Sequence, residues 1–292
     1  MKTPKVSIIT VNYKQPEVTC ELLASINTLS YPNLETIIVD NAQTGDDSLL
    51  YQQHLKHVKV INIAENTGFA KGNNIGIQAA QGDFFLLLNN DTEITNGVIE
   101  ALLNTFKDQT IGAVSPLLKF HSNKEIQFAG FTEINRFTGR NELIREKSNL
   151  GLIDTPYIHG AAVMIRKEVV EQCGQMPEEY FLYYEELDWS RIIRAKGYAL
   201  KVLNTVSVLH KESVSTGKDS PLKVYYQTRN RIHFMRKAHR QSWILFLLYF
   251  LLISLPKNLV THLIKGQTEH LKAFRQAFSH GLLHKKTGYQ LI

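Results

Sequence analysis

Apolar runs alternate with segments of helical spacing along the first 110 residues of the chain. Apolar residues at intervals of three and four predict helices at 17–29 and 68–82. Short apolar runs bounded by turn-forming residues predict strands at 5–13, 31–41, 55–66 and 83–91. Strands that alternate with helices in this way are typical of an α/β fold, so we expect a mostly parallel sheet flanked by helices.

The predicted strands end on polar residues. Phe84–Leu88 is apolar throughout, as a strand covered on both faces requires, and it stops abruptly at Asn89. In open α/β sheets, ligands bind beyond the carboxyl ends of the strands. Four such ends carry Asn or Asp, at Asn12, Asp40, Asn66 and Asp91. We expect these side chains to converge on a ligand, although Asn and Asp are also ordinary loop residues.

The second half of the chain is less regular. A strand is predicted at 111–120, and 159–174 reads as a strand followed by a helix. Residues 136–156 form a polar, poorly patterned stretch that we expect to be a loop. A helix is predicted from about Glu185 to Lys196, where Gly197 stops it, and a further strand ends near His210.

Three acids, Glu185, Glu186 and Asp188, stand at the start of that helix. Acids in a first helical turn complement the helix dipole, which is the structural explanation. Aromatic residues surround them, however, and a carboxyl group in a partly apolar wall has a raised pKa suited to a general base. His210, one of 11 histidines, is by its position alone either a structural residue or a ligand.

The carboxy-terminal region differs from the rest in charge. Residues 223–292 carry a net charge of +11, and the remainder carries −5. An apolar run from Trp243 to Leu255 ends at Pro256 and is shorter than the ~20 residues of a bilayer span. Basic amphipathic segments flank the run, and one helical face carries Leu271, Phe274, Phe278 and Leu282.

This pattern favours association with an anionic membrane surface. The alternative is a helical hairpin that packs on the catalytic domain or on a second subunit, in a homodimer. Nucleic acid is not expected as a partner, because no groove-reading motif or regular basic–aromatic pattern is present. The amino terminus lacks an apolar run long enough for a signal peptide, and Cys20 and Cys173 have no metal-ligand spacing, so we expect a reducing, cytoplasmic location.

A series of motifs carries a resemblance to a known family. In order they are VSIITVNY, IIVDN, ENTGFAKGNNIG, FLLLNNDTEI, HGAAVMIRKEVVEQCGQMPEEYFLYYEELDW, RAKGY, VLH and YYQTRN. The series resembles a bacterial family 2 glycosyltransferase of the rhamnosyltransferase-like branch. The resemblance implies a GT-A fold and transfer from a nucleotide-diphosphate sugar, dTDP-rhamnose or a UDP-hexose, with inversion. It also implies a lipid-linked saccharide acceptor in surface polysaccharide synthesis, at the inner face of the cell membrane.

The resemblance also implies roles for individual residues. Nucleotide-sugar binding falls on Thr10, Asn12, Tyr13, Asp40, Asn66, Gly68, Phe69, Asn73, Asn89 and Asn90. Asp91 matches the last acid of the family's Asp-X-Asp motif, and with His210 it would hold Mg²⁺ or Mn²⁺. Glu186 matches the catalytic base, with Glu185 and Asp188 as the other candidates. The catalytic domain would span 1–222, with nucleotide binding in about 1–115 and the acceptor side in about 116–222, followed by a helical extension at 223–292.

Two positions depart from the family pattern. Asn89 replaces the first Asp of Asp-X-Asp, which removes a negative charge and predicts weak metal binding without the nucleotide. Glu186 replaces an Asp, which lengthens the reach of the base by one methylene. A dinucleotide-dependent oxidoreductase is disfavoured because TVNYKQPE contains no glycine where its fingerprint requires them. A non-catalytic module with the same fold remains the second alternative.

Overall fold

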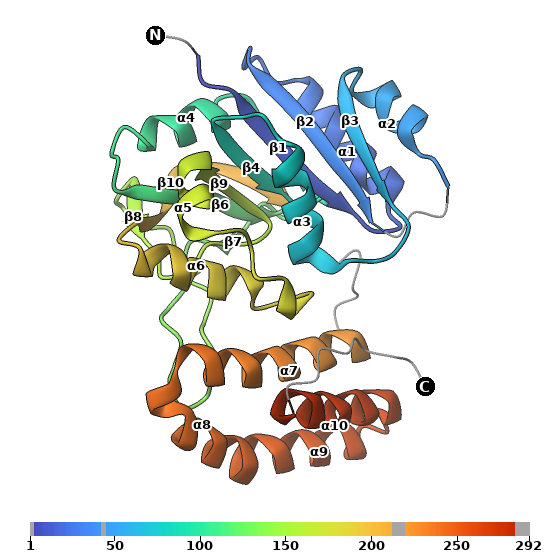
Figure 1. Ribbon diagram of the computed structural model, residues 1–292, viewed down its shortest axis with the longest axis vertical. Helices are drawn as coiled ribbons and strands as arrows, with labels where there is room; N and C mark the ends of the chain where they lie inside the picture. Colours follow the sequence, from blue (N-terminus) through green and yellow to red (C-terminus); the bar gives the residue numbers. More distant parts are fainter. Residues whose placement is uncertain (1–2, 42–44, 212–219, 284–292) are drawn as a thin grey trace.

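The computed structural model describes residues 3–41, 45–211 and 220–283. Figure 1 shows two layers: an α/β body, and a layer of helices beside it formed by the carboxy-terminal region. The chain begins in the body and finishes in the helical layer. The predicted α/β fold with a helical extension is therefore confirmed.

Ten strands form one sheet in the described part of the chain, in the order β3-β2-β1-β4-β9-β6-β10-β5, with β7 on β6 and β8 on β10. Their bounds are β1 Val6–Asn12, β2 Leu34–Asn41, β3 Val58–Ile63, β4 Phe84–Leu88, β5 Thr92–Glu93, β6 Ile111–Phe120, β7 Ile126–Phe128, β8 Leu152–Asp154, β9 Ala162–Arg166 and β10 Ala199–His210. Neighbouring strands from β3 to β4 run parallel, as do β6 and β10, whereas β9 is antiparallel to β4 and β6. The sheet is mixed but mostly parallel.

Helices cover both faces of this sheet (Figure 1). Their bounds are α1 Pro16–Asn27, α2 Ser48–His54, α3 Gly68–Ala79, α4 Val98–Thr105, α5 Lys167–Cys173 and α6 Glu185–Ala195. Along β4, Leu86 and Leu88 join the core cluster under α1 and α4, whereas Phe85 and Leu87 join the cluster under α3. Burial on both faces explains the apolar run, and it leaves the next residues free to be polar.

The predicted loop at 136–156 is only partly irregular. It contains β8, which pairs antiparallel with Lys201–Leu203 of β10, and an isolated bridge joins Asn135 to Arg140. Pairing with β10 gives the backbone groups of β8 their hydrogen-bond partners. Because this pairing needs no apolar sequence pattern, the sequence did not predict β8.

The helical layer consists of α7 Pro221–Ala238, α8 Trp243–Tyr249, a π-helical turn at Phe250–Ser254, α9 Leu255–Ile264 and α10 Thr268–Leu282. The helix does not end where the apolar run ends at Pro256. Pro256 lies in the first turn of α9, directly after the π-helical turn, where the missing N–H and the ring are tolerated without breaking the helix. In the described residues, Arg240–Ile264 is thus one helical stretch of 25 residues, long and apolar enough by length and composition to cross a membrane.

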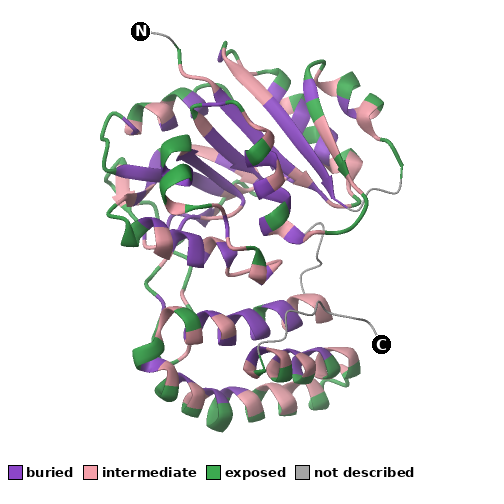
Figure 2. Ribbon diagram, viewed as in Figure 1, coloured by how far each residue is buried: buried purple, intermediate pink, exposed green. Residues whose placement is uncertain are grey.

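This stretch has a packed face and an exposed face. Phe246, Phe250 and Ser254 are buried against the rest of the helical layer, with Phe250 stacked on Phe274 and Phe278 of α10. The opposite face exposes large apolar side chains, and Figure 2 shows exposed positions along the outer side of the same helical layer. The exposed residues are Ile244, Leu245, Leu248, Leu251, Leu252, Ile253, Val260, Leu263 and Ile264, defined here as the apolar face.

The predicted face of α10 behaves differently. Phe274 is buried, and Phe278 and Leu282 pack with it into the core of the helical layer. This face of α10 therefore packs within the protein.

Candidate active site

A closed hydrogen-bond network lies at the carboxyl ends of β1, β2 and β4. Asn12 donates to Asp40 Oδ1 (2.9 Å) and to the Tyr51 hydroxyl (3.0 Å), and Tyr51 donates to Asp40 Oδ2 (3.0 Å). Asn90 donates to Asn12 Oδ1 (3.3 Å) and to Thr19 (3.1 Å). Burial raises the pKa of Asp40 even though its two donors lower it. The structure brings Asn12, Asp40 and Asn90 together, and each is almost fully buried.

Asn41 links this network to the segment before α3. Its amide donates to Asn66 Oδ1 (3.1 Å) and to the carbonyl of Gly68 (3.2 Å), and its Oδ1 accepts from the N–H of Thr67 (2.8 Å). Asn66 therefore lies beside the end of β2, as expected of a strand-end residue. Asn41 was missed, although it follows Asp40 directly in the IIVDN motif.

Gly68 and Phe69 begin α3 against the loop that precedes α6. The N–H of Phe69 donates to the carbonyl of Phe181 (2.7 Å). Gly68 has φ of +82°, and a Cβ there would lie 2.5 Å from the same carbonyl, so only glycine fits. Asn73 points back into its own helix, where its amide donates to the carbonyl of Phe69 (2.9 Å).

Thr10 and Tyr13 lie outside the network. The Thr10 hydroxyl is fully buried within β1 and has no hydrogen-bond partner. Tyr13 is half-buried just past the end of β1, with the Lys14 ammonium 5.5 Å from its ring centroid.

Asp91 and His210 meet at the next strand ends. His210 Nε2 lies 3.2 Å from Asp91 Oδ1, and β10 pairs with β5 at His210–Thr92, which fixes the two side chains on one edge. Both residues are 6 % exposed. Asp91 Oδ1 and the neighbouring Asn89 Oδ1 are buried oxygens without a hydrogen bond. These oxygens are acceptors that await a donor or a cation.

Gln127 of β7 sets the tautomer of His210. With its amide oxygen assigned toward the ring, Gln127 Oε1 lies 2.8 Å from His210 Nδ1, which must then carry the proton. In the tautomer with a single proton on Nδ1, the lone pair of Nε2 faces Asp91. Two lone-pair atoms at 3.2 Å repel unless a proton or a cation lies between them.

The residues fit a divalent cation held jointly with a ligand. Among the described residues, no group of three or more His, Cys, Asp or Glu side chains could hold a metal ion. Asp91 and His210 could supply two ligands, and Mg²⁺ in phosphate-transfer sites typically takes one or two carboxylates with the rest from phosphates and water. Weak metal binding without a nucleotide stays a prediction.

His159 was not predicted. Its ring lies 6.3 Å from that of His210 and stacks on Phe131, and burial, with a smaller contribution from His210, lowers its pKa to about 3. A neutral imidazole thus stands beside the Asp91–His210 pair. The sequence offered one signal, since His159 opens the HGAAVMIR strand, whereas nothing in the sequence marked Gln127.

Glu185 and Glu186 begin α6 as a coupled pair of carboxyl groups. Burial raises the pKa of both, and for Glu185 the nearby charge of Glu186 raises it further. Because two neighbouring buried carboxylates repel each other, the pair favours a state in which one of the two carboxyl groups keeps a proton. One oxygen of each, Oε2, is buried without a hydrogen bond.

Asp188 is fully engaged elsewhere. Its carboxylate accepts from Tyr180 (3.2 Å), Arg191 (2.8 Å) and Lys237 (2.6 Å) and is completely buried. Both oxygens of Asp188 thus accept hydrogen bonds from groups that hold α6 to its neighbours. The geometry therefore favours Glu186 over Asp188 as the base.

Serine side chains tie α6 to the strand ends. Ser190 of α6 accepts from the N–H of Ile158 (3.0 Å), and Ser115 of β6 accepts from the N–H of His159 (3.3 Å). A chain of contacts thus runs from the helix that carries Glu186, through His159, to His210.

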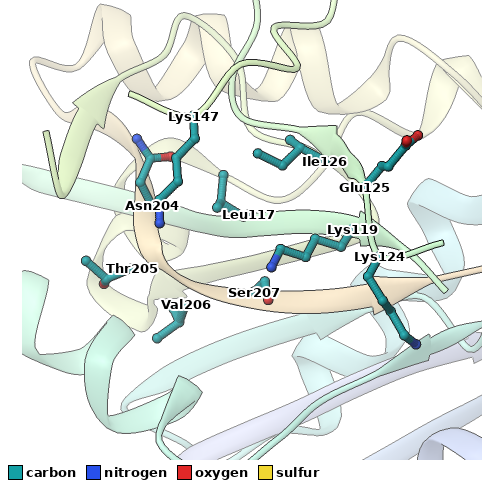
Figure 3. Close-up of a pocket in the computed structure, with 10 residues that line it drawn as sticks. All are labelled: Leu117, Lys119, Lys124, Glu125, Ile126, Lys147, Asn204, Thr205, Val206 and Ser207. Atoms are coloured by element: carbon teal, nitrogen blue, oxygen red, sulfur yellow. The ribbon is translucent and has the colours of Figure 1, made fainter. Parts of the chain in front are cut away.

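A separate hollow of about 250 Å³ lies at the β6–β10 bulge, lined in part by Lys119, Asn204 and Ser207 (Figure 3). None of the predicted site residues lines it.

Comparison with known protein families shows to which family this chain belongs. Residues 7–174, more than half of the chain, match the family model described as glycosyl transferase family 2. The chain belongs to this family. The enzyme class is that of a glycosyltransferase, and the predicted resemblance is confirmed.

Individual relatives agree. The chain is 28% identical to the low-salt glycan biosynthesis hexosyltransferase Agl10 of Haloferax volcanii, over 77% of this chain and 73% of that protein. It is 25% identical to the dTDP-rhamnosyl transferase RfbF of Shigella flexneri, over 80% and 79%. A structure of GalNAc-T7 with UDP, GalNAc and Mn²⁺ superposes with a TM-score of 0.70 at 16% identity, covering 97% of this chain and 58% of that one. This last likeness establishes the GT-A fold.

Proposed function

We propose that this glycosyltransferase moves a hexosyl group, rhamnose first among the candidates, from a dTDP- or UDP-sugar to a hydroxyl of a lipid-linked saccharide, with inversion. The observation that carries the proposal is the Asp91–His210 pair, two buried side chains 3.2 Å apart beside the unpartnered Asn89 Oδ1. The similarity to RfbF favours a dTDP-rhamnose donor, and that to Agl10 keeps other hexoses open.

The donor diphosphate would meet Asp91 and His210, which would hold Mg²⁺ or Mn²⁺ with it. The GalNAc-T7 structure contains both UDP and Mn²⁺, which supports a metal-assisted nucleotide site in this fold. When bound, the cation supplies positive charge that stabilises the negative charge on the leaving nucleoside diphosphate. The strand-end segments around Asp40, Asn66 and Phe69 would form the wall for the nucleoside and sugar.

Glu186 would be the group that accepts the proton. Its carboxylate takes the proton of the acceptor hydroxyl as that oxygen forms a bond to the anomeric carbon, and the bond from this carbon to the diphosphate oxygen breaks on the opposite face. Burial of Glu186 raises its pKa, which strengthens it as a base near neutral pH. A single displacement of this kind inverts the anomeric configuration.

Transfer itself is the test. Purified protein with Mn²⁺, a panel of dTDP- and UDP-sugars and a lipid-linked saccharide should release nucleoside diphosphate and form a glycoside, whose anomeric configuration is read by NMR. Retention of configuration would overturn the single displacement. Donor binding without transfer or hydrolysis for any sugar would favour the non-catalytic module.

We further propose that residues 223–292 attach the catalytic body, residues 1–222, to the cytoplasmic face of an anionic membrane. The support is the apolar face of α8 and α9, which lies on the outside of the helical layer, together with the exposed cations Arg240, Lys257 and Lys265 along the same stretch. Because Phe246 and Phe250 pack inward, the stretch would lie in the plane of the interface rather than span it.

Vesicles test this attachment. The protein should co-sediment with phosphatidylglycerol vesicles more strongly than with phosphatidylcholine vesicles, and the double variant Leu248→Ser, Leu252→Ser should lose most of the binding. Leu49→Ser, an exposed leucine on α2, is the matched control and should bind like the wild type. Dimerisation through the apolar face without vesicle binding, seen by sedimentation velocity, would overturn membrane attachment in favour of a second subunit.

A further inference from the structure

The segment that leads into the proposed base has a strained backbone. Phe181, Tyr183 and Tyr184 have φ of 65°, 67° and 77°, in the left-handed region that bulky side chains rarely adopt. Such a backbone conformation is unfavourable for these residues and persists only where its surroundings hold it. Glu185 and Glu186 follow immediately, so the direction in which α6 starts depends on this segment.

Asn230 of α7 holds the segment from the helical layer. Its fully buried amide Nδ2 donates to the carbonyls of Tyr180 (2.9 Å), Leu182 (2.7 Å) and Tyr183 (2.8 Å). Arg229 donates to Asn230 Oδ1 (2.7 Å), which fixes the amide with its N–H groups toward the segment. One side chain therefore binds three carbonyls within four consecutive residues.

Two cations of α7 hold the ends of the same region. Arg229 donates to the carbonyl of Glu179 through two nitrogens (3.2 and 3.1 Å). The Lys237 ammonium lies 2.6 Å from Glu179 Oε1 and 2.6 Å from Asp188 Oδ2. Glu179 precedes the strained segment, and Asp188 lies inside α6. The strained backbone is thus restrained at its start, centre and end by one helix.

The segment also contacts the proposed donor wall. The carbonyl of Phe181 accepts from the N–H of Phe69, and Gly68 packs against Phe181 too closely for any side chain. A shift of the segment would therefore move the base and its distance from the donor together. Displacements of about 1 Å are enough to reduce turnover ~10²-fold.

We propose that Asn230 is a positioning residue for glycosyl transfer, which holds the strained segment 181–184 so that Glu186 faces the donor site. This inference rests on the proposed function. It makes the helical layer a structural part of the active site: α7 carries both the contacts to the segment and the packing surface for the helix with the apolar face (Figure 1).

The first experiment compares Asn230→Ala with Asn258→Ala. Asn258 lies in α9, and its amide donates to the carbonyl of Ser254 within the helical layer, so it controls for loss of a helical asparagine. We expect kcat to fall at least tenfold for Asn230→Ala, with the Mn²⁺-dependent Kd for the nucleoside diphosphate within threefold of the wild type. Asn258→Ala should keep kcat within twofold. A folded Asn230→Ala with kcat within threefold of the wild type would overturn the inference, as would equal losses in kcat and nucleotide affinity.

A second experiment separates positioning from simple stability. Glycine adopts positive φ without strain, so the loss of kcat caused by Asn230→Ala should be at least threefold smaller when Tyr183→Gly is already present. The single Tyr183→Gly variant supplies the reference, and the double variant remains readable if Asn230→Ala alone fails to fold. An undiminished effect in the glycine background would contradict the role of strain. A wild type that transfers no sugar would refute the proposed function, whereas an active wild type with unaffected variants would refute only this inference.

Discussion

The hydrogen bonding of buried polar atoms differs between two parts of the site, the network around Asp40 and the groups around Asp91 and Glu186. Around Asp40, both carboxylate oxygens are satisfied within the protein, by Asn12 and Tyr51. Around Asp91 and Glu186, buried oxygens remain without a hydrogen bond. Buried polar groups almost always have hydrogen-bond partners. We therefore infer that the network around Asp40 has a structural role and that the unpaired oxygens of Asp91 and Glu186 interact with a ligand. Variants should therefore act on stability in the first part and on chemistry in the second.

Glu186→Gln should have the largest effect on activity. Glutamine keeps the size and removes the base, so kcat should fall by ~10²–10⁴, the usual contribution of a general base. Nucleotide binding should remain. In the wild type, kcat should also fall as the pH drops through the raised pKa of Glu186, because the protonated carboxyl cannot accept a proton. Steady-state kinetics against pH measure both, and full activity of the variant would exclude Glu186 as the base.

Gln127→Leu should have the next largest effect. Without the Gln127 oxygen, His210 Nδ1 loses its acceptor, and the tautomer that presents Nε2 to the metal is no longer favoured. Loss of such a partner typically weakens metal binding ~10–100-fold. The Mn²⁺ concentration needed for half-maximal nucleotide binding should rise accordingly, while Gln53→Leu on the exposed side of α2 should leave it unchanged.

Tyr51→Phe should act mainly on stability. It leaves Asp40 Oδ2 and one amide donation from Asn12 unmatched inside the protein, which should lower the free energy of unfolding by about 1–3 kcal/mol. Urea denaturation measures this, and kcat of the folded variant should stay within about fivefold. A stable variant with kcat reduced a hundredfold would place the Asp40 network in the chemistry instead.

Glu185→Gln should have the smallest effect. Burial raises the pKa of Glu185, which favours its protonated form, and glutamine resembles that form in size and charge. We expect kcat within about threefold of the wild type. A large loss would mean that Glu185 ionises in the cycle and shares the role of base.

Much of the catalytic body could be predicted from the sequence because its signals are local. Strand periodicity, glycines at helix boundaries and Asn or Asp at strand ends each report on a few neighbouring residues. The convergence of Asn12 and Asp40 followed from the rule on strand ends, and the structure joins them by a hydrogen bond. Gln127, Tyr51 and Asn230 act through partners between 11 and 83 positions away, and no local pattern marks such contacts.

The apolar run illustrates the same limit. The composition of the run was evident from the sequence, but the length of the helix that contains it was not. Whether Pro256 breaks the helix depends on the π-helical turn before it. Which face of the helix is packed depended on Phe274 and Phe278 of another helix.

The most direct test of the central claim is thermal stabilisation by dTDP and UDP, with and without Mn²⁺, on the wild type, Asp91→Ala and the control Asp154→Ala on exposed β8. A nucleotide at 100 times its Kd should add about 2.7 kcal/mol to the free energy of unfolding. The account predicts stabilisation of the wild type and of Asp154→Ala only when nucleotide and Mn²⁺ are both present, and its loss in Asp91→Ala. Equal stabilisation of Asp91→Ala, or of the wild type without metal, would contradict it.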